Sequence, residues 1–341
     1  MQLVFSEAEL MTEHDYASPH TVGGVRLHGG FLADGTYQPP RALGRTQALD
    51  NWTAALRERG GDLLDADASL LTGVRMPNLS QHLLLLREGI GRSFWNMLTV
   101  TGKIEARGRL LAEVDFPELQ PAIAEDISEM AVGHLNKGLL VAHGWDEGGK
   151  GDGVGAHDEM WFAARDLVYG VEAFADIEPP ERIGRPESPE RAVPEVAAAT
   201  EGLISFLMNL LIIEFRAEIG FAMTQQLLRA PGTFAGLDDE AEEAAQIIER
   251  IRSDELVHVS SLRLYLGELR EVQFHTEDGG VIAGSEIIDR LWDDLVDWAT
   301  VEQPPLAAAQ ARVDIEPLIL EHADGQRVLA EFDAISDLTP A

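Results

Sequence analysis

The chain has 341 residues, with 59 acidic against 26 basic side chains, a formal net charge of -33 and no cysteine. This charge argues against binding to nucleic acid or to an anionic membrane surface, because both need Lys and Arg. The lack of cysteine excludes disulfides, thiolate metal sites and cysteine nucleophiles. The N-terminus has no basic stretch followed by a long apolar one, so we expect a cytoplasmic protein without a signal peptide.

The first segment, residues 1–76, is irregular and rich in glycine and proline. Short apolar stretches at 22–27 and 31–32 flank glycine turns, which predicts a small β-hairpin. A helix is expected over 46–59, ended by Gly60 and the glycine that follows it.

Long helices are predicted beyond Pro77. The apolar spacing indicates helices over about 80–113 and 122–143, and a shorter one over 157–175 after the glycine-rich stretch 148–155. That stretch lacks a preceding strand and a Gly-Lys-Ser/Thr ending, so we interpret it as a mobile lid and not as a phosphate-binding loop.

The second half of the chain predicts two more long helices, over 197–229 and 238–271, after a proline-rich loop at 176–195. The apolar run at 203–213 is too short to span a bilayer and indicates a buried helix. Beyond it, one helix is expected over 285–300 and two more after Pro305.

This layout predicts a mainly α protein in which residues 77–272 form a four-helix core. Two helical hairpins would be joined by an inserted crossover, residues 146–196, and followed by a C-terminal helical extension, residues 273–341. One long connection is typical of ferritin-like bundles. An unrelated all-α fold is the alternative.

A short motif in the helix over 238–271 is the strongest functional signal. Glu255 and His258 lie three residues apart on the apolar stripe that also holds Ile251 and Leu262, so they should face the core. A buried glutamate without a partner is costly. A Glu-x-x-His pair that points inward from one helix of a bundle is how di-iron and di-manganese carboxylate proteins hold metal.

The preceding long helix carries two more acids, Glu214 and Glu218, on its own apolar stripe. If the two helices form a hairpin, Glu214 and Glu255 lie at the same level, with Glu218 one turn away. The alternative is a buried ion pair with an arginine from elsewhere, such as Arg92 or Arg165.

The first hairpin should supply the other half of a dinuclear site, and its motif is incomplete. His134 lies on an apolar stripe, but Ala131 occupies the position where a Glu-x-x-His motif has its glutamate. Glu129 precedes His134 by five residues, about 140° away on a regular helix, and one π-bulge residue would turn both to a common side. Glu105 is the best carboxylate for the fourth corner, with Glu88 as runner-up.

Two histidines flank the glycine-rich stretch, His143 before it and His157 after it. Together with Glu159 they could complete the first half of the site or line its entrance. The alternative reading is helix capping by Asp158 and Glu159 in the first turn.

Taken together, these features resemble the ferritin-like di-iron carboxylate superfamily over about residues 79–270. The resemblance implies a non-haem oxidase or oxygenase that activates O2 on a small organic substrate. It also implies two iron or manganese ions, which suit hard carboxylate oxygens together with histidine nitrogen. We expect an electron-donor protein as a partner and a homodimer. The alternatives are a metal-free helical binding or scaffold protein, and an iron-storage protein.

The departure at Ala131 predicts an asymmetric site. Ligands on a regular helix need no distortion, so the half with Glu255 and His258 should bind metal more tightly. On this reasoning His258→Ala would remove nearly all metal, whereas His134→Ala would leave about one ion bound.

Overall fold

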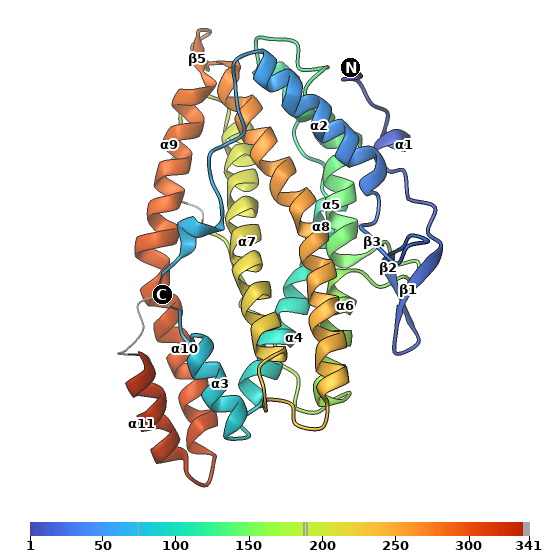
Figure 1. Cartoon of the computed structure of the whole chain (residues 1–341). Coiled ribbons are helices and arrows are strands. Elements are labelled where there is room, and N and C mark those ends of the chain that lie inside the picture. Colours follow the sequence, from blue (N-terminus) through green and yellow to red (C-terminus); the bar gives the residue numbers. More distant parts are fainter. Residues whose placement is uncertain (74, 187, 189, 337–341) are drawn as a thin grey trace.

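The computed structural model describes residues 1–73, 75–186, 188 and 190–336 of the chain. It is an elongated, mainly helical molecule with two long antiparallel helices, α7 (Ala198–Leu228) and α8 (Asp238–Glu271), along its length (Figure 1). Each of these helices begins and ends within one residue of the bounds that the sequence predicts. Their apolar residues fall at helical spacing without a proline or a left-handed glycine, so nothing interrupts either helix.

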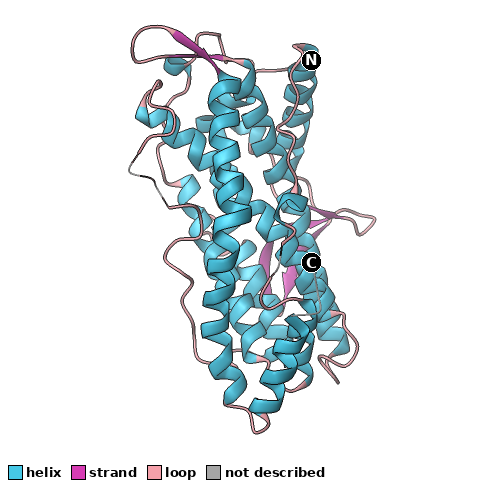
Figure 2. Ribbon diagram, turned by 90° about the vertical axis from the view of Figure 1, so that its left-hand side faces the viewer, coloured by secondary structure: helices cyan, strands magenta, loops and turns pink. Residues whose placement is uncertain are grey.

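The predicted N-terminal hairpin is confirmed and extended to three strands. The antiparallel sheet has the order β1 (Ser18–Val22), β2 (Val25–Phe31) and β3 (Tyr37–Gln38). Gly23 and Gly24 make the first turn with positive φ angles of 56° and 82°, which favour glycine. This sheet lies beside α6 (His157–Tyr169) and α8 at mid-height (Figures 1 and 2).

Two helices, α1 (Glu7–Leu10) and α2 (Ala42–Glu58), complete the N-terminal segment. Trp52 of α2 is fully buried and its indole nitrogen donates a hydrogen bond to the carbonyl of Leu3 at 2.8 Å. The segment therefore packs onto the helical core as part of it. A short 3₁₀ helix, η1 (Ala68–Leu71), follows.

The prediction of one long helix over 80–113 is wrong, because this stretch forms two separate helices. The structure has α3 (Leu79–Arg87), then α4 (Arg92–Gly108) and the 3₁₀ turn η2 (Arg109–Ala112). Gly89 lies between α3 and α4 with a φ of 79°, a left-handed conformation that ends the first helix.

The prediction of a second long helix over 122–143 is wrong as well. Most of that stretch forms turns and short elements: η3 (Gln120–Ala122), η4 (Ala131–His134) and the π segment η5 (Leu135–Leu139), before α5 (Leu140–Gly148) begins. Gly138 in the π segment has a φ of 105°, which an α-helix does not allow. A β-carbon on Gly133 would stand 2.0 Å from the Ile127 carbonyl oxygen, so the backbone turns back on itself there.

The C-terminal part forms a hairpin and three helices that pack along α8, α7 and α3. The hairpin pairs β4 (Gln273–His275) with β5 (Val281–Ala283), which the sequence reading did not predict. The helices are α9 (Gly284–Asp297), continued by the π segment η6 (Trp298–Glu302), then α10 (Gln303–Leu320) and α11 (Gly325–Ser336). They cover the side of α7 opposite the N-terminal sheet (Figure 1).

By length and composition alone, α7 could cross a membrane. Half of its most apolar window is buried against other parts of the molecule, and it carries the buried Glu214. A core helix of a bundle passes the same test, as the sequence reading expected of this run.

Candidate metal centre

Seven acidic and histidine side chains from five helices meet inside the bundle, and each is at most 8% exposed. We call this set the cluster. It combines α4, α5, α6, α7 and α8, and its members are Glu105, His143, Glu147, His157, Glu214, Glu255 and His258. They form two overlapping groups of four, in each of which the ligand atoms all lie within 4.8 Å of one another.

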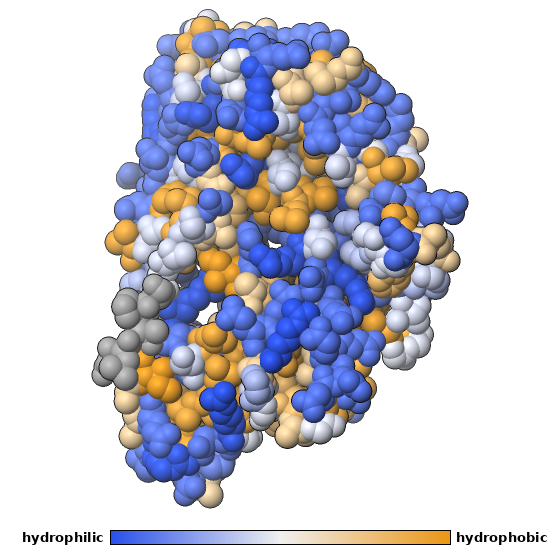
Figure 3. All heavy atoms as spheres, viewed as in Figure 1, coloured by the Kyte–Doolittle hydropathy of each residue, from blue (hydrophilic) through white to orange (hydrophobic). Residues whose placement is uncertain are grey.

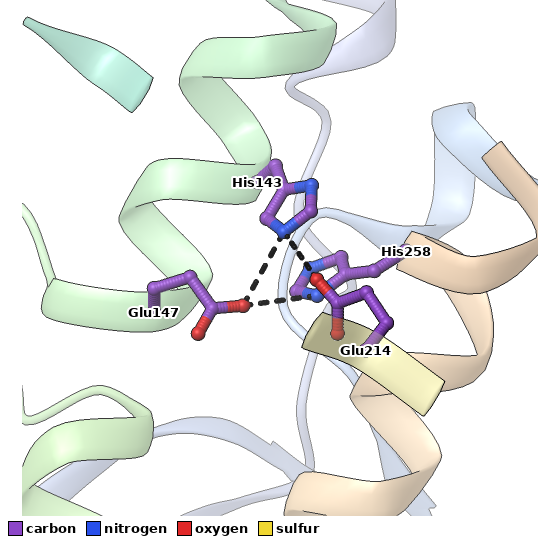
Figure 4. A group of neighbouring side chains, drawn as sticks. All are labelled: His143, Glu147, Glu214 and His258. Carbon is purple, nitrogen blue, oxygen red and sulfur yellow. Dashed lines mark hydrogen bonds and ion pairs between the residues drawn. The ribbon is translucent and has the colours of Figure 1, made fainter. Parts of the chain in front are cut away.

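The first group consists of His143, Glu147, Glu214 and His258, whose side chains point toward one another (Figure 4). Nε2 of His143 lies 3.0 Å from Oε1 of Glu214 and 3.5 Å from Oε1 of Glu147. Nδ1 of His258 lies 3.0 Å from the same oxygen of Glu147. The two imidazoles stack with ring centres 3.7 Å apart, so their inward nitrogens face one small volume.

The second group consists of Glu105, Glu147, His157 and Glu255. Nδ1 of His157 lies 3.1 Å from Oε1 of Glu255 and 3.7 Å from Oε1 of Glu147. The other oxygen of Glu255 lies 2.7 Å from Nδ1 of His258, in the first group. Glu147 therefore belongs to both groups, and Glu255 offers one oxygen to each.

An aspartate lies behind two of the three histidines, on the nitrogen that faces away from the cluster. Nε2 of His258 lies 3.2 Å from Asp146 Oδ2, and Nε2 of His157 lies 3.3 Å from Asp254 Oδ2. When these nitrogens donate to the aspartates, both Nδ1 atoms are left as acceptors that point inward. This is the arrangement that metal-binding histidines usually have.

No lysine or arginine forms an ion pair with Glu105, Glu147, Glu214 or Glu255 in the part of the chain that the structure describes. The predicted alternative of a buried pair with Arg165 is wrong, because Arg165 pairs with Asp166. Arg92 has no ion pair among the described residues. Only histidines balance the four carboxylates, and the buried atoms Glu147 Oε1 and His157 Nδ1 lack a hydrogen bond.

The pKa values show how the cluster shares protons when it holds no cation. Burial, followed by the charge of a neighbouring glutamate, raises the pKa values of Glu105 and Glu214 well above the usual range. Burial would also raise the pKa of Glu255, but His258 and His157 outweigh it and lower that pKa to about 2. Although burial opposes it, the surrounding carboxylates raise the pKa values of His157 and His258. Protons held by these glutamates and histidines thus compensate negative charge that a bound cation could compensate instead.

Several of the sequence-predicted site residues converge and others do not. Glu105, His157, Glu214, Glu255 and His258 are all in the cluster, and Glu214 and Glu255 lie level with each other as the hairpin predicted.

His134 is buried but lies outside the cluster. Its Nδ1 bonds the Met130 carbonyl at 2.8 Å, and its Nε2 accepts from the Phe5 backbone amide at 3.2 Å. Glu129 is exposed in the turn before η4. The π segment in this part of the chain, η5, begins only after His134, so it cannot turn Glu129 toward His134.

The remaining candidates lie on outward faces. Glu218 is 35% exposed and pairs with Arg252 at 3.5 Å, because one further turn of α7 carries it out of the cluster. Glu159 is exposed on α6. The runner-up Glu88 lies outside the cluster and pairs with Arg327.

The sequence reading missed Glu147, and it gave His143 only the role of completing the first half of the site or lining its entrance. The two residues are four apart on α5, a spacing that places them on one helix face. This His-x-x-x-Glu signal was available, but the helix was expected to end at His143, which hid it.

Comparison with protein-family models, with curated proteins and with solved structures finds no match to this chain. The geometry of the cluster therefore carries the functional argument. The chain is a mainly helical protein with buried His/Glu groups that could hold metal.

Proposed function

We propose that this chain is a ferritin-like dinuclear metalloprotein, an oxidoreductase that uses O2 to oxidise or oxygenate a small organic molecule. The observation that carries the proposal is the cluster itself. Four glutamates and three histidines are buried together, with no lysine or arginine to balance them among the described residues. Burying that many ionised groups is very costly unless they are paired or bind a cation.

The charge of the cluster suits two divalent cations. Four ionised carboxylates carry four negative charges, which two such ions neutralise while the histidines stay neutral. One ion would be held by His143, His258 and Glu214, and the other by Glu105 and His157. Glu147 and Glu255 would lie between them, since each contacts residues of both groups.

The order of ligands along the chain supports the ferritin-like assignment. Di-iron carboxylate bundles take one glutamate from each of two helices and a Glu-x-x-His pair from each of the other two. Here α4 supplies Glu105, α7 supplies Glu214, and α8 supplies the intact pair Glu255 and His258. On α5 the pair is reversed to His143-x-x-x-Glu147, and the crossover helix α6 adds His157 as a further nitrogen.

The ligand set favours iron or manganese, which accept carboxylate oxygen together with imidazole nitrogen. Either metal would supply the redox chemistry for O2 activation when bound. The protein's own contribution is to hold the ligands in a buried volume and to orient His157 and His258 through the aspartates behind them. An electron-donor protein, a cytoplasmic location and a homodimer remain part of this proposal.

Metal analysis of the purified protein tests the proposal. After expression in iron- and manganese-replete medium, or after anaerobic addition of Fe(II), we expect about two ions per chain. The ferrous protein should then consume O2 in proportion to the iron bound. His134→Ala is a matched control, because it removes a buried histidine outside the cluster and should leave the metal content unchanged.

Less than about 0.3 iron or manganese per chain under both conditions would contradict the proposal. That outcome would favour a metal-free helical binding or scaffold protein. Iron storage predicts a large many-subunit assembly, so gel filtration at the size of a monomer or dimer would exclude it.

A further inference from the structure

A second candidate site lies on the other side of α7 from the cluster. A partly open cavity of about 500 Å³ is lined by residues of η1, α3, α4, α7, η6 and α10. Two residues along a helix correspond to a turn of about 200°. Arg216, which lines the cavity, and Glu214, which belongs to the cluster, therefore leave α7 in nearly opposite directions. Figure 3 shows this face hollowed between the central and the C-terminal helices.

Two arginines in the cavity lack an anionic partner among the described residues. Arg75 lies half-buried in the wall and forms no ion pair or hydrogen bond there. Arg216 donates one hydrogen bond, to the Ile183 carbonyl at 3.1 Å, while its Nη2 is buried without a partner. Its guanidinium lies over the ring of Trp298, 5.2 Å from the centre, which fixes its orientation.

Arg75 and Arg216 line one cavity without a carboxylate partner in the described part of the chain, although the chain is strongly acidic. Acidic residues outnumber basic ones by 59 to 26, so carboxylates are abundant, and other arginines of the molecule do find them. Burial, with the repulsion of Arg75 added, lowers the pKa of Arg216 to about 10. The two guanidiniums are thus close enough to repel each other, and a shared anion would relieve that repulsion.

A third polar group points to a ligand. His82 is only 3% exposed, lines the cavity, and has a buried Nδ1 without a hydrogen-bond partner. Polar side chains that are this deeply buried are normally satisfied, and a bound ligand is one way in which they become so.

The rest of the wall is mainly apolar. Methionine side chains from α4 and α7 face alanines and isoleucine from α10: Met97, Met223, Ala307, Ala308, Ala311 and Ile315. Asp314 lies exposed at the edge, where it accepts a hydrogen bond from Gln310 at 2.9 Å. A cavity with two arginines in its wall and a mainly apolar lining matches a molecule that has an acidic head and an apolar body.

We propose that this cavity binds an amphipathic organic carboxylate, with its carboxylate between Arg75 and Arg216 and its apolar body along α10. The volume is within the range of about 300–1,000 Å³ that small-molecule sites usually have. The site is independent of the metal centre, and the proposal does not rest on the proposed function.

Titration calorimetry with sodium dodecanoate, compared with dodecylammonium of the same chain length, tests this proposal. We expect one dodecanoate per chain and little binding of the amine. The net charge of -33 favours the amine, so a preference for the anion would have to come from local arginines. Arg216→Gln and Arg75→Gln should each weaken dodecanoate binding at least about tenfold. Ala308→Phe should weaken it by filling the chamber.

The matched control is Arg57→Gln, which changes an exposed arginine on α2 that pairs with Asp62 and should leave binding unchanged. Dodecanoate should also raise the unfolding temperature of the wild type but not that of Arg216→Gln. The latter variant should keep its metal, which separates this test from that of the proposed function. Equal binding of acid and amine, or unchanged binding in Arg216→Gln, would overturn the proposal.

Discussion

His157 and His258 each have an aspartate at the nitrogen that faces away from the cluster, but the two aspartates have different partners. Behind His258, Asp146 is held by the guanidiniums of Arg41 and Arg45, the second at 2.6 Å. Behind His157, Asp254 is held by the hydroxyl of Tyr37 at 3.0 Å and by His28 at 3.0 Å.

The difference concerns charge. Arginine is charged at every pH that the protein meets, so Asp146 is permanently compensated. Its two arginines outweigh burial and hold its pKa well below the ordinary range. Burial lowers the pKa of His28, which leaves this imidazole neutral at pH 7. Asp254 is therefore stabilised mainly by hydrogen bonds, and a bound cation should matter more to that side of the cluster.

Removal of the residue common to both groups should have the largest effect. Glu147→Gln keeps the size of the side chain but removes the carboxylate that contacts His143, His157 and His258. We expect metal content to fall from about two ions to below about 0.3 per chain, since neither group keeps its full ligand set. Metal analysis measures this directly, with exposed Glu159→Gln as the control that should retain two ions. Retention of one ion by Glu147→Gln would show that the two groups bind independently.

Asp146→Asn should cost the most in stability on the arginine-supported side. The change leaves Arg41 and Arg45 buried, at 3% exposure each, without their main counter-charge. Breaking a buried pair in this way destabilises by about 3–5 kcal/mol. Urea unfolding of metal-free protein measures the loss without a contribution from bound metal. The control is Glu13→Gln, which removes the 41% exposed partner of Arg41 and should cost at most about 1 kcal/mol. A similar loss in both variants would mean that burial does not set the cost.

Asp254→Asn should show the opposite balance between stability and metal affinity. None of its partners carries a permanent charge, since Tyr37 and His28 are neutral and His157 can release its proton, so the metal-free protein should lose only about 1–2 kcal/mol. The outer nitrogen of His157 loses its carboxylate acceptor, so the metal affinity should fall about 10–100-fold. Competition with a chelator of known affinity measures the fall. If Asp254→Asn were as destabilising as Asp146→Asn, the two sides would be equivalent.

How far the sequence predicts this cluster depends on the regularity of each helix. Glu214, Glu255 and His258 lie on α7 and α8, which run unbroken, so periodicity alone places them inside and at one level. Glu105 was predicted as well, because α4 is regular around it although the helix before it is broken.

The first hairpin could not be predicted in the same way. The stretch before α5 is folded by Gly133 and Gly138, whose effects depend on close contacts and a left-handed backbone and not on apolar spacing. The predicted helix was therefore placed too early, which selected His134 in place of His143 and Glu147. The supporting groups Asp146, Arg41 and Arg45 come from segments 101–105 residues apart, a contact that helical periodicity cannot indicate.

Tyr37→Phe should give the smallest effect and the sharpest test of the hydrogen-bonded side. The ring of Tyr37 packs against Gly29, where a β-carbon would come within 2.8 Å of the ring, and phenylalanine keeps this packing. Only the hydroxyl is lost, and Asp254 still has His28 and His157 at 3.0 and 3.3 Å. We expect a loss of about 1 kcal/mol in the metal-free protein and a drop in metal affinity of no more than about tenfold. A double variant with Asp254→Asn should show no further loss of affinity, because the hydroxyl acts through that carboxylate. Additive losses would instead mean that Tyr37 reaches the cluster by another route.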